Sequence, residues 1–229
     1  MGREHTDKEY EGELRSLRET ILLMAGRCEE MIFNSVRALV ERDSALAQST
    51  MALDDHVDQA EVRADELCLL VLAKRQPVAS DLRFITQALK MSKDLERIAD
   101  LAVNICERVV LLNEEPPLKP YEDVPRMASI VQKMTRQAID AFVDADTAKA
   151  QRVILMDEEV DRLYHQVIVD LLRIMVADPP TIGRGIHILS ISKFLERVGD
   201  HASNLAEGVI FMVKGKDMRH APADPKKAD

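Results

Sequence analysis

The sequence predicts an all-α protein built as two tandem three-helix bundles. Aromatic residues make up only 3% of the 229 residues and Trp is absent, whereas Leu, Ala, Met, Glu, Lys and Arg are abundant, a composition that favours helix. No segment alternates apolar and polar residues as a half-buried strand does. An internal repeat with a period of about 100 residues, interrupted by a proline-rich segment, divides the chain into two similar halves.

The repeat is clearest in two segments of equal length. Residues 93–107 read KDLERIADLAVNICE, and residues 193–207 read KFLERVGDHASNLAE. In a helix that turns by about 100° per residue, the acidic and amide side chains of each segment share one face, and the apolar side chains lie on the other. Each half therefore carries a polar stripe directed away from its core, formed by Glu96, Asp100 and Asn104 in one and by Glu196, Asp200 and Asn204 in the other.

The first half predicts three helices, over residues 10–41, 44–75 and 80–112, because apolar residues recur there at helical spacing. Asp43 and Ser44 supply a turn and an N-cap between the first two helices. Pro77 ends the second helix, and Lys74 in its last turn suits the helix dipole. The third helix contains the first polar stripe.

A linker separates the halves. Residues 113–120 read NEEPPLKP, and three prolines among charged residues predict a stiff, extended segment. The second half predicts helices over residues 124–143, from the turn at 144–146 to residue 177, and over 181–214. The predicted domains are residues 1–115 and 121–215, each a three-helix bundle, followed by a flexible tail over residues 216–229.

Composition and charge exclude several classes of partner. The net charge of −9 opposes binding to nucleic acid or to anionic membranes. Cys28, Cys68 and Cys106 are scattered among apolar neighbours, which indicates buried thiols of a reducing compartment rather than a disulfide framework. No apolar run approaches the roughly 18 residues of a membrane-spanning helix. We therefore expect a cytoplasmic protein that does not insert into a membrane.

Two pairs of acidic residues are positioned to face the polar stripes. In an antiparallel helical hairpin, residues equally far from the turn lie at one level. Asp58 and Glu96 are equidistant from Pro77, and so are Asp54 and Asp100. The second half repeats this relation about a turn between residues 178 and 179, with Asp161 level with Glu196 and Asp157 level with Asp200. We therefore expect four carboxylates at one level in each bundle.

Such clusters predict metal binding. Carboxylates at one level repel one another unless they are protonated or bridged by cations. Oxygen ligands without a thiolate or a well-placed imidazole suit Mg²⁺, Mn²⁺, Ca²⁺ or iron, and Asn104 or Asn204 could add a carbonyl oxygen. The alternative interpretation is that these acids form an ordinary solvated surface. His201 follows Asp200 but points about 100° away from it, so we expect that it is not a ligand.

The sequence resembles the PhoU family of phosphate-uptake regulators. The two Glu-Arg-(Ile/Val)-(Ala/Gly)-Asp motifs, at residues 96–100 and 196–200, are similar to the acidic signature of that family. Residues 73–83, AKRQPVASDLR, resemble its hairpin, and residues 213–220, VKGKDMRH, resemble its C-terminal end. The second hairpin departs from the pattern, because residues 178–182, DPPTI, lack the basic run.

The resemblance implies two three-helix bundles that carry multinuclear clusters of iron or zinc on their surfaces. Matched by position, the metal candidates are Glu96, Asp100, Glu196 and Asp200, with Asp54, Asp58, Asp157 and Asp161 as companions. The resemblance also implies a regulator rather than an enzyme, often a homodimer. Such a regulator acts between the ATPase subunit of the phosphate ABC transporter and a sensor histidine kinase, and keeps the phosphate-starvation response off when phosphate is sufficient.

Two alternatives belong to other functional classes. A carboxylate-bridged metal enzyme, such as a di-iron oxidase, requires a buried, open coordination site with a general base, and the ferritin-like version requires a Glu-x-x-His pair that neither motif contains. A helical adaptor without metal would carry the acidic residues only as surface. Oxygen uptake with ferrous iron distinguishes the first alternative from the regulator, and metal content distinguishes the second.

Overall fold

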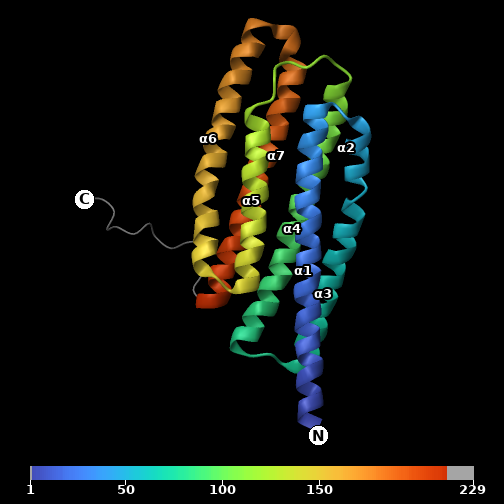
Figure 1. Ribbon diagram of the computed structural model, residues 1–229, viewed down its shortest axis with the longest axis vertical. Coiled ribbons are helices and arrows are strands. Elements are labelled where there is room, and N and C mark those ends of the chain that lie inside the picture. Colours follow the sequence, from blue (N-terminus) through green and yellow to red (C-terminus); the bar gives the residue numbers. More distant parts are fainter. Residues whose placement is uncertain (1, 216–229) are drawn as a thin grey trace, which may run out of the picture.

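The computed structural model describes residues 2–215, with side chains from residue 8 onward, and confirms the all-α prediction. The part of the chain described contains helices and no strand (Figure 1). The elements are α1 (Gly2–Glu41), α2 (Ser44–Met51), α3 (Asp54–Arg75), α4 (Ala79–Asn113), α5 (Asp123–Asp144), α6 (Thr147–Ala177), the 3-10 turn η1 (Pro179–Thr181) and α7 (Ile182–Lys214). The predicted tail over residues 216–229 lies outside the described residues.

The prediction of one continuous helix over residues 44–75 is wrong, because the helix is interrupted between α2, which ends at Met51, and α3, which begins at Asp54. The hydroxyls of Ser49 and Thr50 both donate to the Leu46 carbonyl, at 3.0 and 2.7 Å, and such bonds compete with the helical backbone pattern. The interruption places Asp54 at the N-terminus of a helix. It is the first residue of α3, where a helix N-terminus favours negative charge.

Aspartate caps mark the starts of two helices as the sequence predicted. Asp43 accepts a hydrogen bond from the Leu46 amide at 2.9 Å, and Asp146 accepts from the Ala148 amide at 2.8 Å. The basic residues before Pro77 do more than offset the helix dipole. Arg75 forms ion pairs with Glu13 and Glu9 of α1, which brace the hairpin between α3 and α4.

The two units pack side by side, with α4 against α7 and α1 against α5 (Figure 1). α4 and α7 are antiparallel, so residues near the start of one helix contact residues near the end of the other. Arg83 donates to the Met212 carbonyl at 2.9 Å, and Asp94 lies 2.9 Å from His201. The hydrophobic core continues through both units. The division into domains at residues 1–115 and 121–215 therefore remains a prediction. The two sequence units share one hydrophobic core.

Two arginines fix the linker, one from each unit. Arg42 donates to three backbone carbonyls around the end of α4, among them those of Asn113 and Glu115 at 2.9 and 2.5 Å. Arg184 of α7 donates to the Pro116 carbonyl at 2.9 Å. The segment between α4 and α5 is thus held against both units rather than acting only as a spacer.

A shared core predicts that a cavity in one unit destabilises the whole protein. Leu95 and Leu195 are fully buried, so Leu95→Ala and Leu195→Ala should each lower the free energy of unfolding by about 3 kcal/mol. Urea denaturation followed by circular dichroism should show one transition that shifts as a unit in both variants. Leu69 is 63% exposed, and Leu69→Ala is the control with little effect. Separate transitions for the two units would contradict the shared core.

Candidate metal-binding clusters

The structure places the four acidic residues of the first unit on two neighbouring helices, α3 and α4. Asp54 and Asp58 lie one turn apart at the start of α3, and Glu96 and Asp100 lie one turn apart on α4. Burial, together with the negative charges of Asp58, Asp100 and Asp55, raises the pKa of Asp54 to about 6. Burial and the charge of Asp100 likewise raise the pKa of Glu96. The carboxylates are therefore close enough to repel one another.

The second unit repeats the arrangement between α6 and α7. Burial, together with the charges of Asp200, Asp161 and Glu196, raises the pKa of Asp157 to about 6. Burial and the neighbouring Glu196 raise the pKa of Asp200. The acidic residues of α6 and α7 are therefore electrostatic neighbours, as those of α3 and α4 are in the first unit.

The negative charges are only partly compensated. Arg97 lies 2.9 Å from an Asp100 oxygen, and Lys193 forms an ion pair with Glu196. The Oδ1 atom of Asp54 is buried and has no hydrogen-bond partner. A buried carboxylate oxygen without a partner is costly, and a cation is one group that would satisfy it.

The clusters contain the oxygen ligands that hard cations prefer, but the side chains are not arranged to coordinate one ion. Across the described residues, no three His, Cys, Asp or Glu side chains converge closely enough to hold one ion. Each cluster instead supplies pairs of carboxylates on two neighbouring helices. Water ligands or rotamer changes of the exposed carboxylates would complete the coordination of an oxygen-preferring cation.

The amide residues of the polar stripes have different surroundings. Asn104 donates from Nδ2 to the backbone carbonyl of Asp100 at 2.7 Å, and this bond leaves its side-chain carbonyl oxygen available to a cation. Asn204 lines a pocket between α4 and α7. His201 pairs with Asp94 across the two units, in agreement with the prediction that it points away from the Asp200 stripe. Cys28, Cys68 and Cys106 are buried free thiols, as predicted.

Gly199 leaves room for the carboxylate of Asp157. A Cβ atom at residue 199 would lie 2.9 Å from the Oδ1 atom of Asp157, and the first unit has Ala99 at the equivalent position. Gly199→Ala should push the Asp157 carboxylate outward and lower its pKa toward the ordinary value, because the group becomes better hydrated. Carboxyl titration by NMR measures this change. Gly183 faces open space, so Gly183→Ala should leave the Asp157 pKa unchanged.

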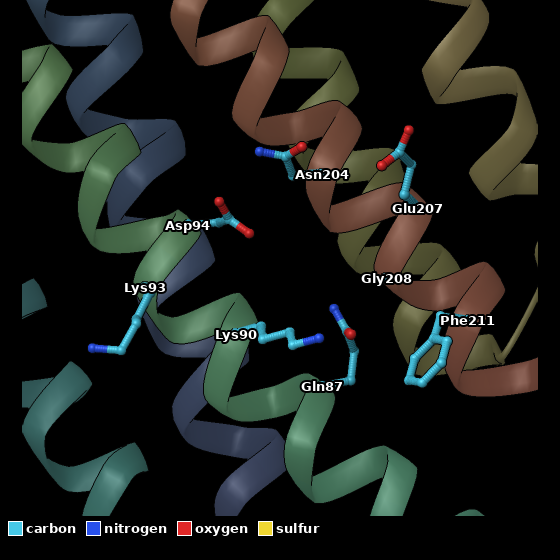
Figure 2. Close-up of a pocket in the computed structure, with 8 residues that line it drawn as sticks. All are labelled: Gln87, Lys90, Lys93, Asp94, Asn204, Glu207, Gly208 and Phe211. Carbon is cyan, nitrogen blue, oxygen red and sulfur yellow. The ribbon is translucent and has the colours of Figure 1, made fainter. Parts of the chain in front are cut away.

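Sequence reasoning missed the pocket that Asn204 lines. It has a volume of about 390 Å³ and lies where α4 crosses α7 (Figure 2). Gln87 contributes a buried carboxamide that lies directly against Gly208. One difference between the repeats could have indicated the pocket, because Gly208 stands where the first unit has the much larger Arg108. Residues 87 and 208 meet only because the two units pack with α4 antiparallel to α7, and no pattern in the sequence predicts that packing.

A family model described as PhoU domain matches this chain twice, at residues 21–109 and 124–209. The chain belongs to the PhoU family. Each match covers one of the two three-helix units, so the family domain is the repeating unit of the fold. The resemblance inferred from the two acidic motifs and the hairpin is confirmed.

Named PhoU proteins are similar over nearly the whole chain. The phosphate-specific transport system accessory protein PhoU homolog of Pseudomonas aeruginosa is 41% identical over 217 residues, which cover 94% of this chain and 90% of that protein. The homolog of Caulobacter vibrioides is 37% identical over 216 residues, with 94% of each chain covered.

Solved PhoU structures share the fold. The crystal structure of PhoU from Pseudomonas aeruginosa covers 90% of this chain and 100% of its own, with a TM-score of 0.88 at 41% identity. The phosphate transport system regulatory protein PhoU from Streptococcus pneumoniae covers 91% of this chain and 98% of its own, with a TM-score of 0.83. At 24% identity, the latter similarity concerns the fold alone.

Proposed function

We propose that this chain regulates phosphate uptake and represses the phosphate-starvation response when phosphate is sufficient. The observation that carries the proposal is its 41% identity, over 94% of its length, to a protein named as an accessory of the phosphate-specific transport system. The role in transport follows from the names of the relatives, and the direction of regulation is our inference.

The proposed mechanism is contact with other proteins in the cytoplasm. The partners are the ATPase subunit of the phosphate transporter and a sensor histidine kinase, and the regulator is a homodimer. Among residues 2–215, no helix has the long apolar stretch that crossing a bilayer requires. Exposed apolar side chains along α6 offer a surface for protein contact, namely Leu155, Val169, Leu172 and Val176.

The acidic clusters are proposed to hold metal ions that tie neighbouring helices together. In the first unit, the carboxylates of Asp54, Asp58, Glu96 and Asp100 would be the ligands, and in the second those of Asp157, Asp161, Glu196 and Asp200. Bound cations would remove the repulsion that raises the pKa of Asp54 and Asp157. Iron or zinc is expected from the family resemblance, and Mn²⁺ or Mg²⁺ also suits oxygen ligands.

A deletion strain of the source organism tests the regulatory role. It should express a phosphate-starvation reporter at high phosphate, and expression of the chain should restore repression. A reporter that stays high although the protein accumulates would contradict the proposal.

Co-purification tests the contacts directly. The chain should retain the phosphate transporter ATPase subunit and the cytoplasmic part of the kinase. An ATPase subunit of an unrelated ABC importer is the matched control. Retention of all ATPase subunits alike, or of none, would contradict a specific docking role.

A further inference from the structure

The pocket between α4 and α7 contains polar groups that the proposed regulation does not use. Figure 2 shows the side chains of Lys90 and Gln87 reaching from α4 into the space beside α7, with Asp94 and Asn204 at the other end of the pocket. Lys93, in contrast, points away from this space (Figure 2) and pairs with Glu61 at 3.4 Å.

Gln87 is the strongest sign that a ligand belongs here. Its side chain is only 3% exposed, and its carboxamide opens onto the pocket rather than onto a hydrogen-bond partner among the described residues. Buried amide groups are normally satisfied, because an unpaired one costs free energy. The carboxamide lies where any side chain at residue 208 would collide with it, so Gly208 is what makes room for it.

Lys90 adds a positive charge to the lining of the pocket. Its ammonium group lies 5.6 Å from the centre of the Phe211 ring. Asp94 also faces the pocket, but one of its oxygens is held by His201 at 2.9 Å. The remaining Asp94 oxygen can accept a hydrogen bond from a hydroxyl group. The pocket therefore combines one cation and two amide groups with two carboxylates, Asp94 and Glu207, of which Figure 2 shows Glu207 near the Asn204 end.

The volume indicates more than a bare ion. At about 390 Å³ the pocket is within the range of small-molecule sites, and a single phosphate ion would fill only a small part of it. The Phe211 ring supplies one apolar wall. The equivalent positions of the first unit carry Arg108 and Leu111 in place of Gly208 and Phe211, so the repeat does not reproduce this lining.

We propose that this pocket binds a small phosphate monoester that also carries hydroxyl groups, such as a sugar phosphate or a nucleoside monophosphate. The phosphate group lies at Lys90 and accepts a hydrogen bond from the Gln87 carboxamide. The hydroxyl-bearing end of the ligand lies beside Asn204 and Asp94. A hydroxyl group of the ligand donates to Asp94. The site joins one helix of each unit, so an occupant links the two PhoU domains.

Isothermal titration calorimetry on the full chain tests the proposal, with EDTA present so that metal-bridged binding at the acidic clusters does not contribute. The probes are ribose 5-phosphate, AMP, adenosine and inorganic phosphate. At least one ester should bind saturably, and adenosine should not bind. Inorganic phosphate should bind at least tenfold more weakly than that ester.

Variants locate the site. Lys90→Gln should weaken ester binding at least tenfold, whereas Lys133→Gln, at an exposed lysine of α5, should not change it. Gly208→Leu should abolish binding by displacing Gln87, and Gly183→Leu, which faces open space, is its control. If Gly208→Leu fails to fold, Lys90→Gln decides alone.

Three results would overturn the proposal: no binding of either ester, equal binding in Lys90→Gln and in the unaltered protein, or inorganic phosphate binding as tightly as the esters. None of these results bears on docking to the transporter, so the site and the proposed regulation fail independently.

Discussion

Asp54→Asn combined with Asp157→Asn should stabilise the metal-free protein at pH 7.5 by about 5 °C in melting temperature. Both carboxyls have a pKa of about 6 in the folded protein, raised by burial and by neighbouring carboxylates. In the unfolded chain an aspartate has a pKa near 3.9, so the folded state binds protons more tightly. Stability is therefore lost as the pH rises from about 4 to about 6, and asparagine removes that loss.

The pH dependence supplies the internal test of this prediction. At pH 4, Asp54 and Asp157 are protonated in the folded protein and about half protonated in the unfolded chain, so most of the advantage of the double variant should disappear. Thermal melts in EDTA at pH 4 and pH 7.5 measure the difference. Glu19→Gln combined with Glu66→Gln, at exposed residues outside both clusters, is the control. An equal gain at both pH values would show that repulsion is not its cause.

Adding Mn²⁺ or Fe²⁺ should stabilise the unaltered protein. A ligand at one hundred times its dissociation constant contributes about 2.7 kcal/mol per site, so two occupied clusters should raise the melting temperature by about 10 °C. The order of stability then reverses. Asp54→Asn combined with Asp157→Asn removes one ligand from each cluster, so with metal present this variant should melt below the unaltered protein.

A monovalent cation is the control for the rise in melting temperature. K⁺ at the same ionic strength screens the carboxylates without binding two of them at once, so it should give a much smaller shift. An equal shift with K⁺ would mean that screening alone relieves the repulsion. The clusters would then act as surface charge, as the metal-free adaptor requires.

Much of the fold was predictable because it depends on local signals. Asp43, Asp146 and Pro77 mark helix ends through capping and a missing amide, and each acts within a few residues. The level of Asp54 with Asp100 follows from a turn position and the rise of a helix. These relations need no knowledge of distant packing, and the structure bears them out.

Other features depend on contacts between distant segments. The break before Asp54 arises from two hydroxyls that share the Leu46 carbonyl, and a helix interior tolerates such bonds in many other sequences. The pocket needs Gln87 to meet Gly208 across two units, a pairing that no pattern within one half contains. Whether the carboxylates converge on an ion depends on rotamers, which the sequence does not specify.

Metal content tests the central claim most directly. The protein purified without chelator should contain stoichiometric metal by elemental analysis after loading with iron, zinc or manganese. Asp100→Asn combined with Asp200→Asn, one substitution in each cluster, should lose most of it. The account predicts metal in the first protein and little in the second. Equal metal in both, or none in either after loading, would contradict the claim that the two acidic clusters bind metal ions.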